Sequence, residues 1–105
     1  MGRGRRVQPL KLAEKLITIR QRLDLSQAQM FRRLGVTRSR VYVSHISSYE
    51  LGTREPPLDV LLQYARVAGV PMEALVDDEL DLPEKLPSEV THEWVMTRRE
   101  RRSSR

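Results

Sequence analysis

The sequence predicts an all-α protein of five short helices joined by tight turns. Apolar residues recur at helical spacing in two stretches, 12–23 and 58–68. Serine, glycine and proline stand where helices commonly begin and end. No stretch alternates apolar and polar residues strongly enough to build a sheet, although Val41–Val43 has a local β-preference.

The first expected helix follows Pro9. Its apolar stripe repeats at intervals of four, three and four residues: Leu12, Leu16, Ile19 and Leu23. Lys11, Lys15 and Arg22 would sit off that stripe.

The second helix is expected over Gln27–Leu34, because Ser26 and Gln29 form a capping-box pattern at its start. The Ser26 hydroxyl accepts from the Gln29 amide, and the Gln29 side chain accepts from the amide of Ser26. Gly35 ends the helix. The apolar residues expected to be buried on it are Met30, Phe31 and Leu34.

A third, short helix is expected around Ile46 and Tyr49, and Gly52 ends it. The Arg-Glu-Pro-Pro sequence that follows must be extended or a turn, because a residue before proline avoids the α region.

The fourth helix is the strongest in the chain, with Gly69 as its C-cap, and Pro71 opens a fifth that runs to about Val76. The residues expected on the buried face of the fourth helix are Leu58, Leu61, Leu62, Ala65 and Ala68.

Charge is segregated along the chain. Residues 1–40 hold eleven Lys or Arg and two acids, net +9; residues 41–93 hold three and eleven, net −8; residues 94–105 hold five and one, net +4. The total is only +5. This segregation favours one face built for a polyanion such as nucleic acid, with solvated surface charge as the alternative.

Several classes of protein fit poorly. A chain of 105 residues forms one domain with a modest core, so a deep, water-excluding pocket is not expected. The absence of cysteine excludes disulfides, thiolate metal sites and a thiol nucleophile. His45 and His92 lie far apart without metal-ligand spacing, so no metal or cofactor is expected. Without a signal peptide or long apolar run, we expect a cytoplasmic, nucleoid-associated protein with no membrane partner.

Both ends of the chain differ from the middle. Residues 1–8 are expected to form a flexible basic arm, in which Arg3, Arg5 and Arg6 enter a minor groove or remain free. Residues 77–93 form an acidic extension with prolines, expected to be extended and docked. Residues 94–105 are expected to be a disordered basic tail.

The residues around His45 contain the groups of a hydrolase, but their spacing argues against an enzyme. Ser44 and His45 are successive on a helix and do not face each other, and no acid stands ready to orient the histidine.

Four segments in order resemble the Cro- and Xre-type helix-turn-helix family of phage and bacterial regulators. They are "IRQRLDLSQAQM" over the first two helices, "LGVT" at the turn, "ISSYELGTREPP" over the third helix and "LDVLLQYARVAGVPMEAL" over the last two. The resemblance covers about residues 9–76 and implies a five-helix repressor-like bundle as the DNA-binding domain. In that family the third helix lies in the major groove while the second crosses the backbone.

The resemblance implies a set of DNA contacts. Gln27, aimed outward at the start of the second helix, would meet the backbone. Thr53 and Arg54 match positions that meet phosphate, and the turn at Gly52 would bring their amides to the surface. Side chains on the third helix suit base edges, with capping or solvation of the helix as the alternative for each: Ser44, His45, Ser47 and Ser48.

Three further residues have structural roles by the same resemblance. Ile46 anchors the third helix in the core. Arg20 and Glu50 form an ion pair that holds the third helix against the first.

The chain departs from the family at the turn between the second and third helices. Ten residues separate Gly35 from Ile46, where the family has about six. Phe31 stands where the family prefers a small residue, so a wider helix spacing would require the longer turn. We hypothesise that this enlarged turn, extended or helical, brings three side chains onto DNA: Arg38, Arg40 and Tyr42. The third helix would then begin at Arg38 or only at Ser44.

These features predict a sequence-specific DNA-binding regulator that acts as a repressor and binds an inverted-repeat operator as a homodimer. The main alternative is an antitoxin-like interaction module, in which binding a protein partner comes first and DNA binding serves autoregulation. RNA binding ranks below both, because stacking aromatics are scarce. Apolar residues after the fourth helix either form the dimer interface or pack within one monomer: Leu75, Val76, Leu80, Leu82 and Leu86.

Overall fold

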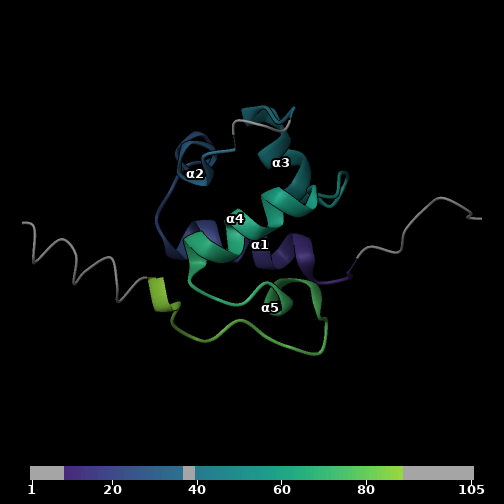
Figure 1. Cartoon of the computed structure of the whole chain (residues 1–105), viewed down its shortest axis with the longest axis vertical. Coiled ribbons are helices and arrows are strands. Elements are labelled where there is room, and N and C mark those ends of the chain that lie inside the picture. The colour runs from purple at the N-terminus through teal and green to yellow at the C-terminus, as the bar shows by residue number, and fades with distance from the viewer. Residues whose placement is uncertain (1–8, 37–39, 89–105) are drawn as a thin grey trace, which may run out of the picture.

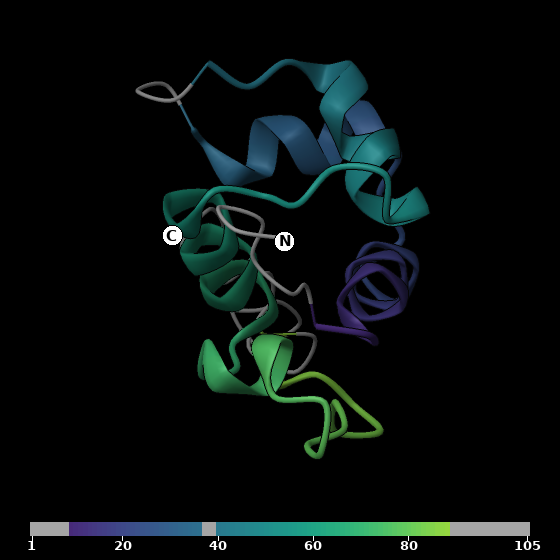
Figure 2. The same cartoon turned by 90° about the vertical axis from the view of Figure 1, so that its right-hand side faces the viewer.

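The computed structural model describes residues 9–36 and 40–88. Within those ranges the chain forms five helices and no strand, which confirms the all-α prediction. The helices are α1 (Leu12–Arg22), α2 (Gln27–Leu34), α3 (Val43–Leu51), α4 (Leu58–Ala68) and α5 (Glu73–Val76). In Figure 1, α2 and α3 form one end of the molecule, α1 and α4 cross its middle, and α5 lies at the opposite end. Figure 2, turned by 90°, shows α4 and α1 on opposite sides of the same bundle.

A single hydrophobic core joins all five helices with the segment after α5. Tyr49 of α3 and Tyr64 of α4 supply its largest side chains, and Leu86 closes it from beyond α5. The other large side chains that are fully buried are those of Leu16, Ile19, Met30, Leu34, Ile46, Val60, Leu61 and Leu75. Phe31 packs against this core but is only partly buried, whereas Met30 and Leu34 on the same helix are buried as expected.

The helix ends follow the predicted signals. The Gln29 amide donates to the Ser26 hydroxyl over 3.1 Å, and the Ser26 amide donates to the Gln29 side-chain oxygen over 2.7 Å. This capping box begins α2 at the expected residue. Gly35 and Gly69 end α2 and α4 with φ of 63° and 80°, values that favour glycine.

The buried face of α4 differs from the one expected. Leu58 and Leu62 are 61% and 37% exposed, while Val60 and Tyr64 are buried in their place. The Tyr64 ring offers more apolar surface to the core than a leucine, and turning it inward rotates Leu58 and Leu62 toward solvent. The outer side of α4 therefore carries apolar residues that the monomer does not bury.

In the enlarged turn, one residue before and one residue after positions 37–39 pack against the core. Val41 is buried and Val36 is partly buried against the core. Tyr42 has an extended backbone, with φ −120° and ψ 160°, and α3 begins at Val43, close to the later of the two expected starts. Residues 40–42 of the turn are not helical, and of these Tyr42 is extended. Arg38 lies outside the described residues.

The acidic extension docks onto α1 through polar contacts. The Asp78 carboxylate accepts from the amides of Leu10 and Lys11, over 2.8 and 3.0 Å, and so caps the start of α1 from outside the helix. The buried Lys15 ammonium donates to the carbonyls of Ala74, Asp77 and Leu80, over 2.7, 3.0 and 2.7 Å. Lys15 is thus part of the interior, although it lies off the apolar stripe of α1.

Further along the extension, the Arg22 guanidinium donates to the Pro83 carbonyl. Of the five residues given either to a dimer interface or to packing within one monomer, Leu75 and Leu86 are completely buried in the core of their own chain, so the second alternative holds for them. Leu82 is partly buried against the same core. Leu75 lies on α5, which packs against α1 and α4, and Leu86 packs inward where the extension runs back along α1.

Candidate functional site

The N-terminal end of α3 presents polar and aromatic side chains to solvent. Arg40, Val43 and Ser44 are exposed, and the Tyr42 side chain is 63% exposed. Ile46 is completely buried three residues into the helix. A helix anchored from behind in this way can offer its first turn to a groove without losing its place in the fold.

His45 serves the structure of α3 as well as its surface. Its Nδ1 accepts from the Tyr42 amide over 3.2 Å, and its own amide donates to the Tyr42 carbonyl over 2.8 Å. Its ring lies edge-on to the Tyr42 ring at 5.4 Å and tilted to the Tyr49 ring at 6.2 Å. Because Nδ1 accepts, the proton of the neutral ring is assigned to Nε2, which leaves an N–H donor for a ligand.

The serines of α3 differ in exposure. Ser44 is exposed, whereas Ser47 and Ser48 are partly buried. The Ser48 carbonyl accepts from the amides of Thr53 and Arg54 over 3.0 and 3.3 Å, and from the Thr53 hydroxyl over 3.3 Å. These bonds close the C-terminal end of α3.

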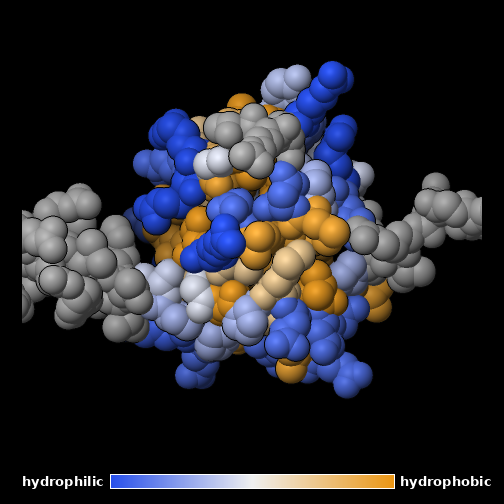
Figure 3. All heavy atoms as spheres, in the orientation of Figure 1, coloured by the Kyte–Doolittle hydropathy of each residue, from blue (hydrophilic) through white to orange (hydrophobic). Residues whose placement is uncertain are grey.

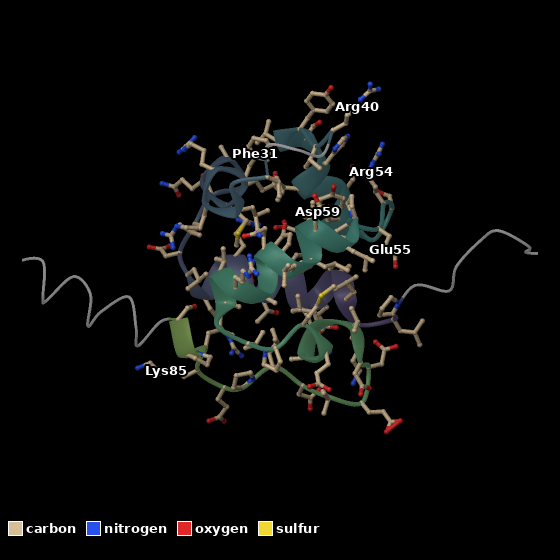
Figure 4. The ribbon with its side chains drawn as sticks, viewed as in Figure 1. Phe31, Arg40, Arg54, Glu55, Asp59 and Lys85 are labelled. Atoms are coloured by element: carbon tan, nitrogen blue, oxygen red, sulfur yellow. The ribbon has the colours of Figure 1, made fainter. Side chains whose placement is uncertain are left out.

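The prediction for the loop that leaves α3 after Gly52 is therefore wrong in one respect. The amides of Thr53 and Arg54 turn back to α3 instead of facing outward, because the carbonyls at a helix end need donors. The Arg54 side chain remains exposed. Figure 4 shows that Arg40 and Arg54 both project from the α3 end of the molecule.

Arg20 of α1 and Glu50 of α3 form a bidentate pair between the two helices. Arg20 donates from Nε to Oε2 over 2.6 Å and from Nη2 to Oε1 over 3.0 Å, and its Nη1 donates to the Leu25 carbonyl over 3.0 Å. The Glu50 side chain is only 4% exposed and that of Arg20 is 19% exposed. The hydrogen bonds to Glu50 raise the pKa of Arg20 further. The pair ties α1, the α1–α2 turn and α3 together.

Gln27 joins this pair instead of pointing outward as expected. Its Nε2 donates to Glu50 Oε1 over 3.1 Å, and the residue is partly buried. A buried carboxylate has more acceptor positions than Arg20 alone fills, so it draws the neighbouring amide inward. The same bond fixes the direction of Gln27, whose amide nitrogen carries a second N–H.

Two cations on α2 were not singled out in the sequence. Arg32 and Arg33 are exposed in its last turn and line an open depression together with Leu25 and Gln29. Adjacent arginines at the end of an amphipathic helix were the available signal, but their position relative to α3 depends on the fold.

The described residues contain no cluster of side chains suited to binding a metal ion. Over residues 9–36 and 40–88, no three His, Asp or Glu side chains lie close enough to hold a metal ion. The His45 Nδ1 bonds to the Tyr42 amide rather than to a serine. Nor is any helix in this part of the chain long and apolar enough to cross a membrane.

Comparison with known proteins adds independent support. A family model described as a helix-turn-helix domain matches residues 11–78. The cryptic phage CTXphi transcriptional repressor RstR of Vibrio cholerae is 33% identical over 79 residues, which span 74% of this chain and 67% of the relative. No solved structure gives a significant match.

Proposed function

Since the chain belongs to the helix-turn-helix family of phage and bacterial transcriptional regulators, we propose that α3 enters the major groove of an operator and that the bound protein represses transcription. DNA binding and regulation of transcription follow from the family. The operator, the contacts and repression are the proposal. A repressor of this kind would act on the DNA of the nucleoid.

The observation that carries the proposal is the exposed start of α3. Ser44 can donate to or accept from a base edge, and the Nε2–H of His45 can reach guanine or a phosphate. Arg40 precedes them as an exposed, non-helical residue, and its long side chain suits a contact with the backbone beside the groove. These side chains share one end of a helix that Ile46 holds in the core.

Phosphate contacts would flank this groove contact on both sides. Arg54 leaves the exit loop beside α3, and Gln27 lies at the start of α2, where free helix amides attract phosphate. Glu50 accepts from one N–H of Gln27, and in this proposal the other N–H donates to a phosphate. In this arrangement the pair of Arg20 and Glu50 supports DNA binding by orienting Gln27, without touching DNA.

We propose further that the protein binds an inverted repeat as a homodimer. One short helix reads too few base pairs for a specific site, and two-fold pairing doubles the contacts. An antitoxin-like role receives less support, because the described part of the acidic extension is bonded to its own α1 rather than left for a partner.

Selection from random duplex DNA tests the proposal. The full chain should enrich an inverted repeat with half-sites about one helical turn apart. Selected sequences without any common motif would contradict specific recognition. Co-purification of the chain with a stoichiometric second protein, together with no enrichment, would favour the interaction module.

A further inference from the structure

The outer side of α4 carries two apolar residues that the monomer leaves exposed, beside the charged Asp59 and Arg66. Leu58 and Leu62 lie four residues apart, one turn along the same side of the helix, and both are exposed. Val76 of α5 is also 37% exposed, and α5 packs against α4. Figure 3 looks onto this side: hydrophobic spheres lie over α4 and toward α5, with hydrophilic ones between and around them.

The charges of α4 complement each other across a two-fold axis. Asp59 and Arg66 lie at equal distances on either side of the midpoint between Leu62 and Gln63. At 100° per residue both charges fall on the same flank of the stripe formed by Leu58 and Leu62. In an antiparallel pair of α4 helices, Asp59 of each copy would therefore meet Arg66 of the other.

The position of α4 suits two copies on one duplex. In Figures 1 and 2, α3 lies at one end of the molecule and α4 on a side face. A two-fold axis directed toward the α3 end brings two α4 faces together and leaves both α3 helices facing the same way. Two half-sites of an inverted repeat require this orientation.

We propose that the outer face of α4 binds a second copy of this chain in an antiparallel α4–α4 contact. Leu62 packs near the two-fold axis, Leu58 lies along the aliphatic stem of the other copy's Arg66, and Asp59 pairs with the same guanidinium. The use of this contact on an inverted repeat rests on the proposed function. The contact between copies does not, and it can be measured without DNA.

Cross-linking provides the first test, because the chain contains no cysteine. Leu62→Cys should place two thiols near the axis. Leu10→Cys is the control: this position is 88% exposed and lies two residues before α1, the helix on the opposite side of the bundle from α4. In a glutathione buffer, Leu62→Cys should give an equilibrium yield of disulfide-linked dimer about tenfold higher than the control. Equal yields would overturn the proposal, including the case in which the chain pairs through another face.

Charge exchange provides the second test. Asp59→Arg and Arg66→Asp should each weaken dimerisation in sedimentation equilibrium, and the double variant should restore it. Thermal unfolding of each variant checks that the fold persists. A double variant that associates no better than the single variants would overturn the assigned pairing.

The two proposals fail separately. If Leu62→Cys cross-links but no duplex is enriched by selection, the α4 contact stands and the proposed function fails. If an inverted repeat is enriched and Leu62→Cys cross-links no better than Leu10→Cys, the function stands and this interface fails.

Discussion

The two ends of the molecule use polar side chains in opposite ways. At the α1–α5 end, Lys15 and Asp78 bond backbone groups of their own chain and hold the extension against α1. At the α3 end, Arg40, Ser44 and Arg54 are exposed. Polar groups thus stabilise the fold at one end and remain accessible for binding at the other. Changes at the first end should alter stability, and changes at the second should alter DNA binding.

Glu50 is the exception to this comparison, because it belongs to α3 at the exposed end and yet its side chain is buried and bonded within the fold. Glu50→Ala leaves the Arg20 guanidinium without its carboxylate and releases Gln27. We expect a loss of about 2–3 kcal/mol in the free energy of unfolding, measured by urea denaturation. Glu79→Ala, at an exposed glutamate, is the control and should have little effect. A Glu50→Ala protein as stable as the control would show that the pair contributes nothing.

Lys15→Met should also lower the free energy of unfolding, at the other end of the molecule. It leaves three carbonyls without their donor in a partly buried site, at a cost of about 2 kcal/mol. Lys11→Met removes the same charge from the start of the same helix, where an exposed ion pair with Asp81 is worth less than about 1 kcal/mol. If both variants lose equal stability in urea, net charge rather than the three hydrogen bonds accounts for the effect.

Alanine substitutions at the glycines that end α2 and α4 compare the packing at two places in the molecule. Gly35 and Gly69 both have positive φ, so alanine is strained at either position by about 1–2 kcal/mol. A Cβ on Gly35 would meet nothing within 4 Å, whereas one on Gly69 would lie 3.0 Å from the amide nitrogen of Ser88. Gly69→Ala should therefore lose about 1 kcal/mol more than Gly35→Ala. Equal losses would mean that the chain at Ser88 moves away freely.

The smallest effect concerns Asp78 and depends on pH. The amides of Lys11 and Leu10 lower the pKa of this carboxyl below its usual value. A lowered pKa in the folded state gives stability that is present above the unfolded pKa and disappears as pH falls through the folded pKa. Asp78→Ala should lower the Tm by about 3 °C at neutral pH, and the difference should shrink below about pH 4. A difference that is unchanged at low pH would show that the carboxylate charge is not its cause.

The sequence contained the helices because their signals are local. Periodic apolar residues, the box of Ser26 and Gln29, and the glycine stops each act within a few residues. The contacts of Lys15 join residues 59 to 65 positions apart, and no local pattern announces them. Local patterns also could not predict which face of α4 is buried, because whether Leu62 or Tyr64 points inward depends on the shape of the core.

The candidate site follows the same division. The sequence could predict that Arg40 and Ser44 are exposed. Once Ile46 is assigned to the core, neither residue falls on the buried side of the segment. The directions of Gln27 and of the Thr53 amide were not, because each depends on an acceptor supplied by the folded chain, Glu50 in one case and the end of α3 in the other.

The salt dependence of DNA binding tests the central claim, that the start of α3 is the surface that meets DNA. Arg40→Ala should weaken binding to the selected operator and reduce the slope of log affinity against log salt by about 1. Lys85→Ala removes the same charge at the opposite end of the molecule and should leave affinity and slope unchanged (Figure 4). Equal slopes for wild type and Arg40→Ala, or an equal loss in both variants, would contradict the assignment of this surface.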